Sequence, residues 1–254
     1  MENFDFYISS NGRLIIKEYD IDLLVDFNQS SIPSMPEAVE SAVRIAGRDG
    51  DVPLKTTYEP LPFIIVAYTE DNLTPTEKRD IELKMDRFMH KMKNKKITFA
   101  MERDNKCYNV KYSGALTTVN YPMHLMFTIP VKSSDSYAKV ISESEIVGNN
   151  SLESNTVEEV GAIFTILGPA QTPKISFNGE QMQYDNVIDE GASLVINSKN
   201  STATMISAEG VKTNAMRYYN HIFPKVQPGV NELVIQSGID DESLVKVEWN
   251  DLTF

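Results

Sequence analysis

The chain has 254 residues, enough for one large or two medium domains with a real hydrophobic core. Its net charge of −12, from 24 Lys and Arg against 36 Asp and Glu, argues against a surface that grips nucleic acid, because each phosphate contact requires a basic side chain. One cysteine, Cys107, excludes an internal disulfide framework. No apolar run approaches the roughly 20 residues of a membrane-spanning helix, so no membrane contact is expected.

The charge is unevenly distributed along the chain. Residues 1–132 hold 17 basic and 19 acidic side chains, whereas residues 133–254 hold 7 and 17. The first part is therefore close to neutral and the second is strongly acidic. We predict two domains, 1–132 and 138–254, joined by a polar linker at 133–137.

The first sixty residues predict a hairpin followed by a long loop. Asn11-Gly12 lies between apolar segments and favours the positive φ angles of a tight turn, and a second extended run covers 21–27. Residues 28–60 are predicted to be a mostly irregular excursion, within which 38–45 can pair as a strand. Its bends are expected at its prolines and glycines: Pro33, Pro36, Gly47, Gly50, Pro53 and Pro60.

One helix is predicted, over residues 75–95. Thr74 suits the N-cap, Pro75 suits the first helical position, and Glu77 completes a capping box. Apolar residues then recur at helical spacing, which predicts one buried face. The lysines of 91–96 close the helix where its dipole favours cations, and phosphate binding there is a distant alternative.

Elsewhere the sequence predicts β-strands. After an apolar run at 61–68, the periodicity becomes two from residue 97, and we expect consecutive antiparallel strands at 97–101, 107–112, 115–119 and 123–131. The second half shows short strands, regular turn signals and no long helix, which is typical of a β-sandwich. These strands are expected at 138–147, 157–167, 173–177, 194–197, 204–207, 232–236 and 244–249.

No residue pattern indicates catalysis, a cofactor or a metal. His90, His124 and His221 lack ligand spacing, and Cys107 is expected to be a small buried side chain. The acidic pairs around Asp49 and Asp240 match no calcium loop and are interpreted as turn formers. Among aromatic residues, Trp249 alternates with buried positions and is assigned to the core. Tyr218 and Tyr219 are the better candidates for an exposed, glycan-contacting pair.

Three segments together resemble the distal tail protein (Dit) family of siphophages that infect Gram-positive bacteria. The first is Arg44-Ile45-Ala46-Gly47-Arg48-Asp49-Gly50-Asp51, which resembles a Gly-Arg-Asp-Gly turn of that family. The second runs from Tyr108-Asn109-Val110-Lys111-Tyr112 through 123–129. The third is Phe223-Pro224…Pro228-Gly229-Val230-Asn231-Glu232-Leu233, ending in Val245-Lys246-Val247-Glu248-Trp249. The resemblance covers nearly the whole chain in order, but Asp135-Ser136-Tyr137 stands where the family often has an Asp-Pro-aromatic turn.

The resemblance implies a mainly β fold, with an N-terminal tail-tube-like β-sandwich carrying the helix and a C-terminal galectin-like β-sandwich. It also implies a non-enzymatic virion protein, assembled in the host cytoplasm, that forms a hexameric ring at the phage tail tip. The ring would join the major tail tube protein to the tail hub with its associated lysin, and to receptor-binding or baseplate proteins. No cofactor and no specific nucleic-acid binding are expected.

In this interpretation the excursion at 28–60 is an arm that contacts a neighbouring copy, since a closed ring repeats one contact between unlike surfaces. An ordered surface loop with an internal Arg–Asp pair is the alternative for the same residues. A carbohydrate-binding module, using the second domain, is the alternative for the whole chain, and a wall hydrolase is a third interpretation. The candidate interface residues of the arm are Ile32, Met35, Val39, Val43, Ile45, Arg48 and Val52.

Overall fold

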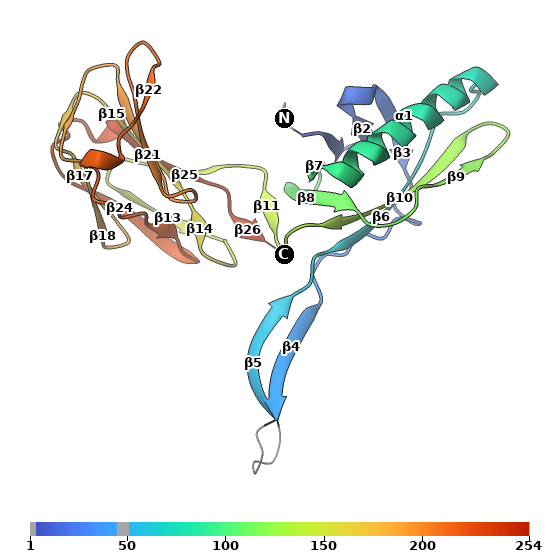
Figure 1. The fold of residues 1–254 in the computed structure, drawn as a ribbon, viewed down its shortest axis with the longest axis horizontal. Coiled ribbons are helices and arrows are strands. Elements are labelled where there is room, and N and C mark those ends of the chain that lie inside the picture. The colour runs from blue at the N-terminus through green and yellow to red at the C-terminus, as the bar shows by residue number, and fades with distance from the viewer. Residues whose placement is uncertain (1–3, 45–50, 254) are drawn as a thin grey trace. The chain divides into compact units, whose positions relative to one another are not determined.

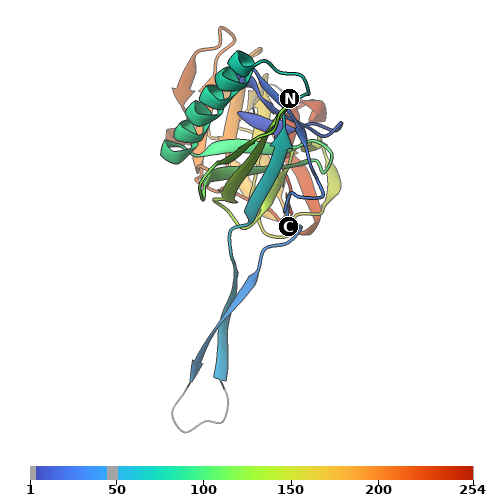
Figure 2. The ribbon, with the colours of Figure 1, turned by 90° about the vertical axis from the view of Figure 1, so that its right-hand side faces the viewer.

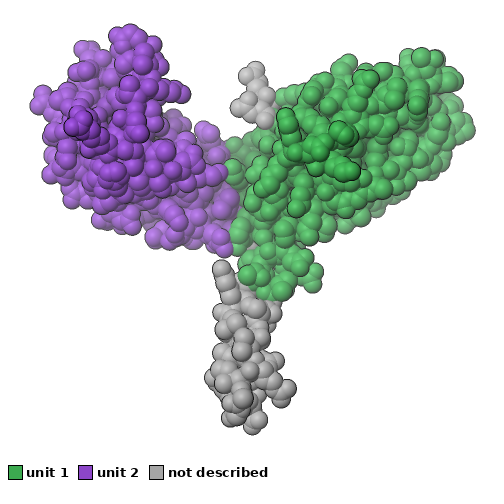
Figure 3. Space-filling view, viewed as in Figure 1, with its two compact units in different colours: residues 1–141, 254 green, residues 142–253 purple. Residues whose placement is uncertain are grey.

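The computed structural model describes residues 4–44 and 51–253, with side chains outside 40–56. The chain divides into two compact units, unit 1 with residues 1–141 and 254 and unit 2 with residues 142–253 (Figure 3). The division follows Ile141 and thus lies beyond the segment 133–137. The reason is local, because β11 (Ala138–Val140) still pairs with β8 (Lys106–Tyr112) of unit 1, and Ala138 is fully buried in its core.

Unit 1 is built on one sheet that closes on itself. Its strands follow the order β11-β8-β7-β1-β2-β3-β6-β10-β9, and an additional pairing of β8 with β10 makes the sheet a barrel. This differs from the expected two-sheet sandwich, and one pair in the sheet, β1 with β7, runs parallel. The remaining strands are β1 (Phe6–Ile8), β2 (Arg13–Ile16), β3 (Ile21–Val25), β6 (Pro62–Tyr68), β7 (Ile97–Met101), β9 (Thr117–Asn120) and β10 (Leu125–Ser133).

The helix α1 (Pro75–Asn94) packs on this barrel (Figure 1). It begins as the sequence predicts: Thr74 Oγ1 accepts from the backbone N–H of Glu77 at 3.3 Å, and Glu77 accepts from the backbone N–H of Thr74 at 2.8 Å. Its apolar face joins the barrel interior, where the ring of Phe88 meets that of Phe6 edge-on at 5.2 Å. The buried apolar residues of α1 are Met85, Phe88, Met89 and Met92.

The segment between β3 and β6 is an ordered ribbon rather than an irregular loop. Strands β4 (Ala38–Arg44) and β5 (Asp51–Tyr58) pair with each other in antiparallel register, from Ala38 opposite Tyr58 to Arg44 opposite Asp51. In the described part of the chain they form a two-stranded sheet of their own. Figures 1 and 2 show this ribbon extending away from the barrel. We call residues 28–60 the arm.

Unit 2 contains two sheets that share one core. The six-stranded sheet has the order β12-β25-β15-β20-β21-β22, and the four-stranded sheet has the order β13-β24-β17-β18. Phe164 from the first sheet meets Phe177 from the second edge-on at 5.1 Å. The strands are β12 (Ser144–Val147), β13 (Asn150–Ser154), β15 (Ile163–Leu167), β17 (Lys174–Phe177), β18 (Glu180–Gln183), β20 (Ser193–Asn197), β21 (Thr202–Ile206), β22 (Lys212–Asn214), β24 (Gly229–Ser237) and β25 (Val245–Trp249), with short pieces at β14 (Val160–Gly161), β16 (Ala170–Gln171), β19 (Val187–Ile188), β23 (Lys225–Val226) and β26 (Leu252–Thr253).

Candidate assembly surface of unit 1

The residues predicted as interface anchors fall into four groups. Ile32 is partly buried and packs against the core of its own unit, so it anchors the arm internally. Met35 and Val39 are 61% and 40% exposed and remain available to a partner. Val43 lies in β4 and Val52 in β5, with side chains outside the described set. Ile45 and Arg48, like Gly47, Asp49 and Gly50, lie outside the described residues.

The incoming end of the arm is fixed to the barrel by backbone hydrogen bonds. Ser31 and Ile64 exchange two of them, at 2.8 and 2.9 Å. The hydroxyl of Ser30 donates to the carbonyl of Asp26 at 2.7 Å and accepts from the backbone N–H of Val66 at 2.9 Å. The arm therefore leaves the barrel at a defined position, although its strands pair only with each other in the described chain.

The outgoing end of the arm is held by the segment that the sequence assigned to the linker. Ser133, which is buried, accepts from the N–H of Leu61 at 2.8 Å. The hydroxyl of Ser136 donates to the carbonyl of Tyr58 at 2.6 Å, and the rings of Tyr58 and Tyr137 meet edge-on at 6.0 Å. Sequence reasoning missed this contact, because nothing local connects residues so far apart in the chain.

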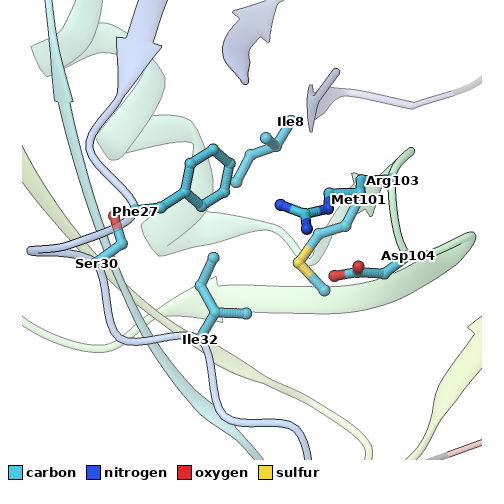
Figure 4. A pocket seen from close by; sticks show the side chains of 7 residues that line it. All are labelled: Ile8, Phe27, Ser30, Ile32, Met101, Arg103 and Asp104. Carbon is cyan, nitrogen blue, oxygen red and sulfur yellow. The ribbon is translucent and has the colours of Figure 1, made fainter. Parts of the chain in front are cut away.

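An apolar pocket opens at the base of the arm (Figure 4). Its volume is about 270 Å³, and Ile8, Phe27, Ile32 and Met101 supply its apolar wall. Phe27 is 48% exposed, which is unusual for a phenylalanine beside a folded core. The lip carries the two exposed charges of the β7–β8 turn together with one hydroxyl: Arg103, Asp104 and Ser30. We call this feature the arm-base pocket.

A second exposed apolar feature is the tip of the β9–β10 hairpin. Tyr121 and Met123 are 40% and 48% exposed there. The ammonium of Lys78 on α1 is buried beneath them and donates to Asn120 Oδ1 at 3.2 Å and to the carbonyls of Tyr121 and Pro122 at 2.5 and 3.0 Å. A buried charge is costly unless its donors are satisfied, and here three acceptors meet the three donors. Residues 120–124 are called the hairpin tip below.

The expected exposed aromatic pair of unit 2 is wrong in one member. Tyr218 is 41% exposed, whereas Tyr219 is 3% exposed and donates its hydroxyl to the carbonyl of Ile222. Burial raises the pKa of Tyr219. Tyr218 is the last residue of a short 3-10 helix (Met216–Tyr218) and Tyr219 follows it in extended backbone, so the two side chains have different surroundings. Trp249 is buried as predicted, and its indole donates to Asp251 Oδ1 at 2.8 Å. Of the predicted pair, the structure therefore leaves only Tyr218 exposed, with its ring edge-on to that of Tyr184 at 6.3 Å.

The other titratable candidates have structural partners. Nδ1 of His124 lies 3.3 Å from Asp71 Oδ1. As a turn former, Asp241 accepts from the hydroxyl of Ser243 at 2.7 Å and from its N–H at 2.9 Å, and these hydrogen bonds lower the pKa of Asp241. Cys107 is half-buried rather than fully buried, and burial raises the pKa of its thiol. His90 and His221 are exposed.

The lysines at the end of α1 do more than meet the helix dipole. Lys91 is paired with Glu18, and its ammonium lies 3.2 Å from Asp5 Oδ1. The hydrogen bond to Glu18, followed by that to Asp5, raises the pKa of Lys91.

Over the described residues, His, Cys, Asp and Glu side chains form no group of three or more that could hold a metal ion. No helix within the described ranges is both long and apolar enough to cross a membrane.

Two solved structures from phages share this fold. No protein-family model and no curated protein matches the sequence. The crystal structure of the Dit protein of phage SPP1, described as a paradigm of the hub adsorption apparatus in phages that infect Gram-positive bacteria, is similar with a TM-score of 0.66 at 13% identity. The similarity covers 91% of this chain and 94% of that one. A chain of the phage P2 baseplate in its activated conformation is similar with a TM-score of 0.51 at 9% identity, over 96% and 94%.

Proposed function

We propose that this chain is a structural, non-catalytic component of a phage tail tip. More particularly, it acts as a distal tail protein of the Dit type. The observation that carries the proposal is the shared fold with SPP1 Dit over 91% of this chain and 94% of the other. A similarity that extends through both units supports a common architecture better than a match to one common β-domain, because β-sandwiches and barrels serve many functions.

Assembly occurs through unit 1, which corresponds to the proposed ring-forming domain 1–132, and the copies close into the hexameric ring. The charge distribution supports this choice of unit. Residues 1–132 carry 17 basic and 19 acidic residues and repel a copy of themselves weakly, whereas residues 133–254 carry 7 and 17. The arm, with Met35 and Val39 exposed, supplies contact area beyond the barrel.

Unit 2, which holds most of the predicted second domain 138–254, is the proposed galectin-like domain. Its acidic surface suits a domain that stays apart from its own copies. The proposed partners of the ring are the major tail tube protein, the tail hub with its lysin, and receptor-binding or baseplate proteins. The protein assembles in the host cytoplasm and becomes part of the virion. Glycan binding by unit 2 is not proposed, since Tyr219 and Trp249 are both buried.

Light scattering and negative-stain imaging of the purified full chain test the proposal. We expect annular particles with a central hole and a mass that is a fixed multiple of the 28.6 kDa chain. Addition of purified tail tubes is expected to place the particles at tube ends. A chain that stays monomeric at high concentration and ignores tail tubes contradicts the proposal.

A further inference from the structure

We infer that neighbouring copies join by inserting the hairpin tip of one copy into the arm-base pocket of the next. The inference rests on the proposed self-assembly and names the surfaces that perform it. Tyr121 and Met123 are the inserted side chains, and Ile8, Phe27 and Met101 form the receiving wall.

The pocket has the size and chemistry to receive such a tip. An apolar cavity of roughly 150 Å³ holds one benzene molecule. The arm-base pocket, at about 270 Å³, therefore has room for one aromatic ring and part of a second side chain. Met101 lines it with an unbranched thioether, which adapts to an incoming shape and contacts aromatic rings favourably.

The lip of the pocket carries one positive and one negative side chain, and both are available to pair with a second copy. Within the described chain, neither Arg103 nor Asp104 makes an ion pair or a side-chain hydrogen bond that offsets its charge, although both flank apolar walls. Charges of both signs also lie near the hairpin tip: Asp71, 67% exposed, lies beside His124, and Arg79, 69% exposed, pairs with Glu82 at 3.4 Å. A charged rim around an apolar centre is the common anatomy of a protein interface.

The hairpin tip is held in advance of any contact. Lys78 satisfies the carbonyls of Tyr121 and Pro122 from below, and the ring of His124 lies 4.9 Å from that of Tyr121. A loop that is already ordered loses less conformational entropy on binding, so its exposed aromatic side chain contributes more affinity. A buried lysine at this position is difficult to explain by folding stability alone. An apolar side chain there would avoid the cost of removing the ammonium from water.

The two surfaces lie at the same end of the barrel but at different positions around it. The N–H of Asn72 donates to the carbonyl of Met123 at 3.1 Å, which places the hairpin tip beside the end of β6. Arg13 bridges from β2 to Glu70 at 3.0 Å, and Ser10 donates to Glu102 beside the pocket at 3.1 Å. Two unlike, complementary patches at one level define a head-to-tail contact, which closes into a ring when its rotation divides a full turn.

Cross-linking between copies tests the inference. In a Cys107→Ser background, one batch carries Met123→Cys and another carries Phe27→Cys, and the two are mixed and treated with a short bismaleimide. We expect a covalent dimer in the mixture at least tenfold above either batch alone. Leu83→Cys, an equally exposed position on α1, replaces Met123→Cys in the matched control and is expected to give background only.

A second measurement places a charge in the inferred contact and follows self-association. Met123→Asp is expected to weaken self-association at least tenfold by light scattering, whereas Leu83→Asp leaves it unchanged, with circular dichroism confirming that both are folded. Rings that persist in Met123→Asp, together with background cross-linking, overturn the inference and leave the proposed function standing. An unmodified chain that never assembles contradicts both.

Discussion

At the scale of single residues, Asn231 organises the turn that resembles the family's Pro-Gly-x-Asn motif. It is fully buried, and its amide makes four hydrogen bonds of 2.8–2.9 Å. Oδ1 accepts from the N–H of Gln227 and from Nδ2 of Asn178, while Nδ2 donates to the carbonyls of Gln227 and Gly229. Each donor and acceptor position of the amide is used, so no other side chain of similar size can replace it.

Asn231→Leu is therefore expected to lower the free energy of unfolding by about 3 kcal/mol, because buried polar groups lose their partners. Asn231→Asp should also destabilise, since a carboxylate would face two carbonyl oxygens. Urea denaturation measures both changes. Val230→Ala, at the neighbouring 71% exposed position, is the control and should change little. A loss no larger than in the control would show that the network is dispensable.

Tyr108 supplies a pH-dependent contribution to stability. It is buried between Phe63 and Phe99, and burial raises its pKa from 10.0 to about 12. The unfolded chain loses this proton first as the pH rises. The contribution is complete below pH 10 and is lost as the pH rises towards 12. The free energy of unfolding falls as the pH rises over this interval, and in Tyr108→Phe this fall should be smaller by about 2 kcal/mol. Identical slopes by urea denaturation would contradict this.

At the scale of elements, the capping box fixes where α1 begins. Thr74→Ala removes the acceptor for the N–H of Glu77 and is expected to cost about 1 kcal/mol of unfolding free energy. Thr74→Ser keeps the hydroxyl and should remain near the unmodified protein. Denaturant titration followed by circular dichroism separates the two. Equal losses in both variants would mean that the methyl group, rather than the cap, stabilises this end of the helix.

Elements with local signals could be predicted from the sequence, and their pairing could not. The helix from Pro75 follows from its capping box, and in the predicted Asn11-Gly12 turn Gly12 takes a positive φ of 79°. The parallel pairing of β1 with β7 and the closure of β8 onto β10 join distant segments that carry no local mark of each other. Barrel and sandwich are therefore indistinguishable from strand patterns alone.

The arm shows why a proline can mislead. Pro53 suggested an irregular segment, since proline cannot donate to a β-ladder. A two-stranded ribbon has two open edges, however, and Pro53 lies opposite Ala42, next to the register shift between Ser41 and Ala42. The inferred assembly surface shares this limit of local signals. Met35 and Val39 follow from the sequence, but the pocket and the hairpin tip combine residues of β1, β7 and the β9–β10 turn that meet only in the fold.

At the scale of the whole molecule, the charge distribution determines how salt affects assembly. A ring of chains that each carry −12 accumulates repulsion, most of it from the acidic second half. The inferred contact is apolar at its centre, so it gains little from ionic attraction. Salt screens exposed charges over about 10 Å at 0.1 M and about 3 Å at 1 M.

Raising the sodium chloride concentration from about 0.1 M to about 1 M is therefore expected to favour the ring over the monomer, because the screening length shortens. Mass photometry at a fixed protein concentration measures the two populations. Arg103→Ala should show the same direction, since an exposed charge at the rim of the contact is screened at high salt. Dissociation of the ring by salt would mean that charged pairs, and not an apolar tip in an apolar pocket, hold the copies together.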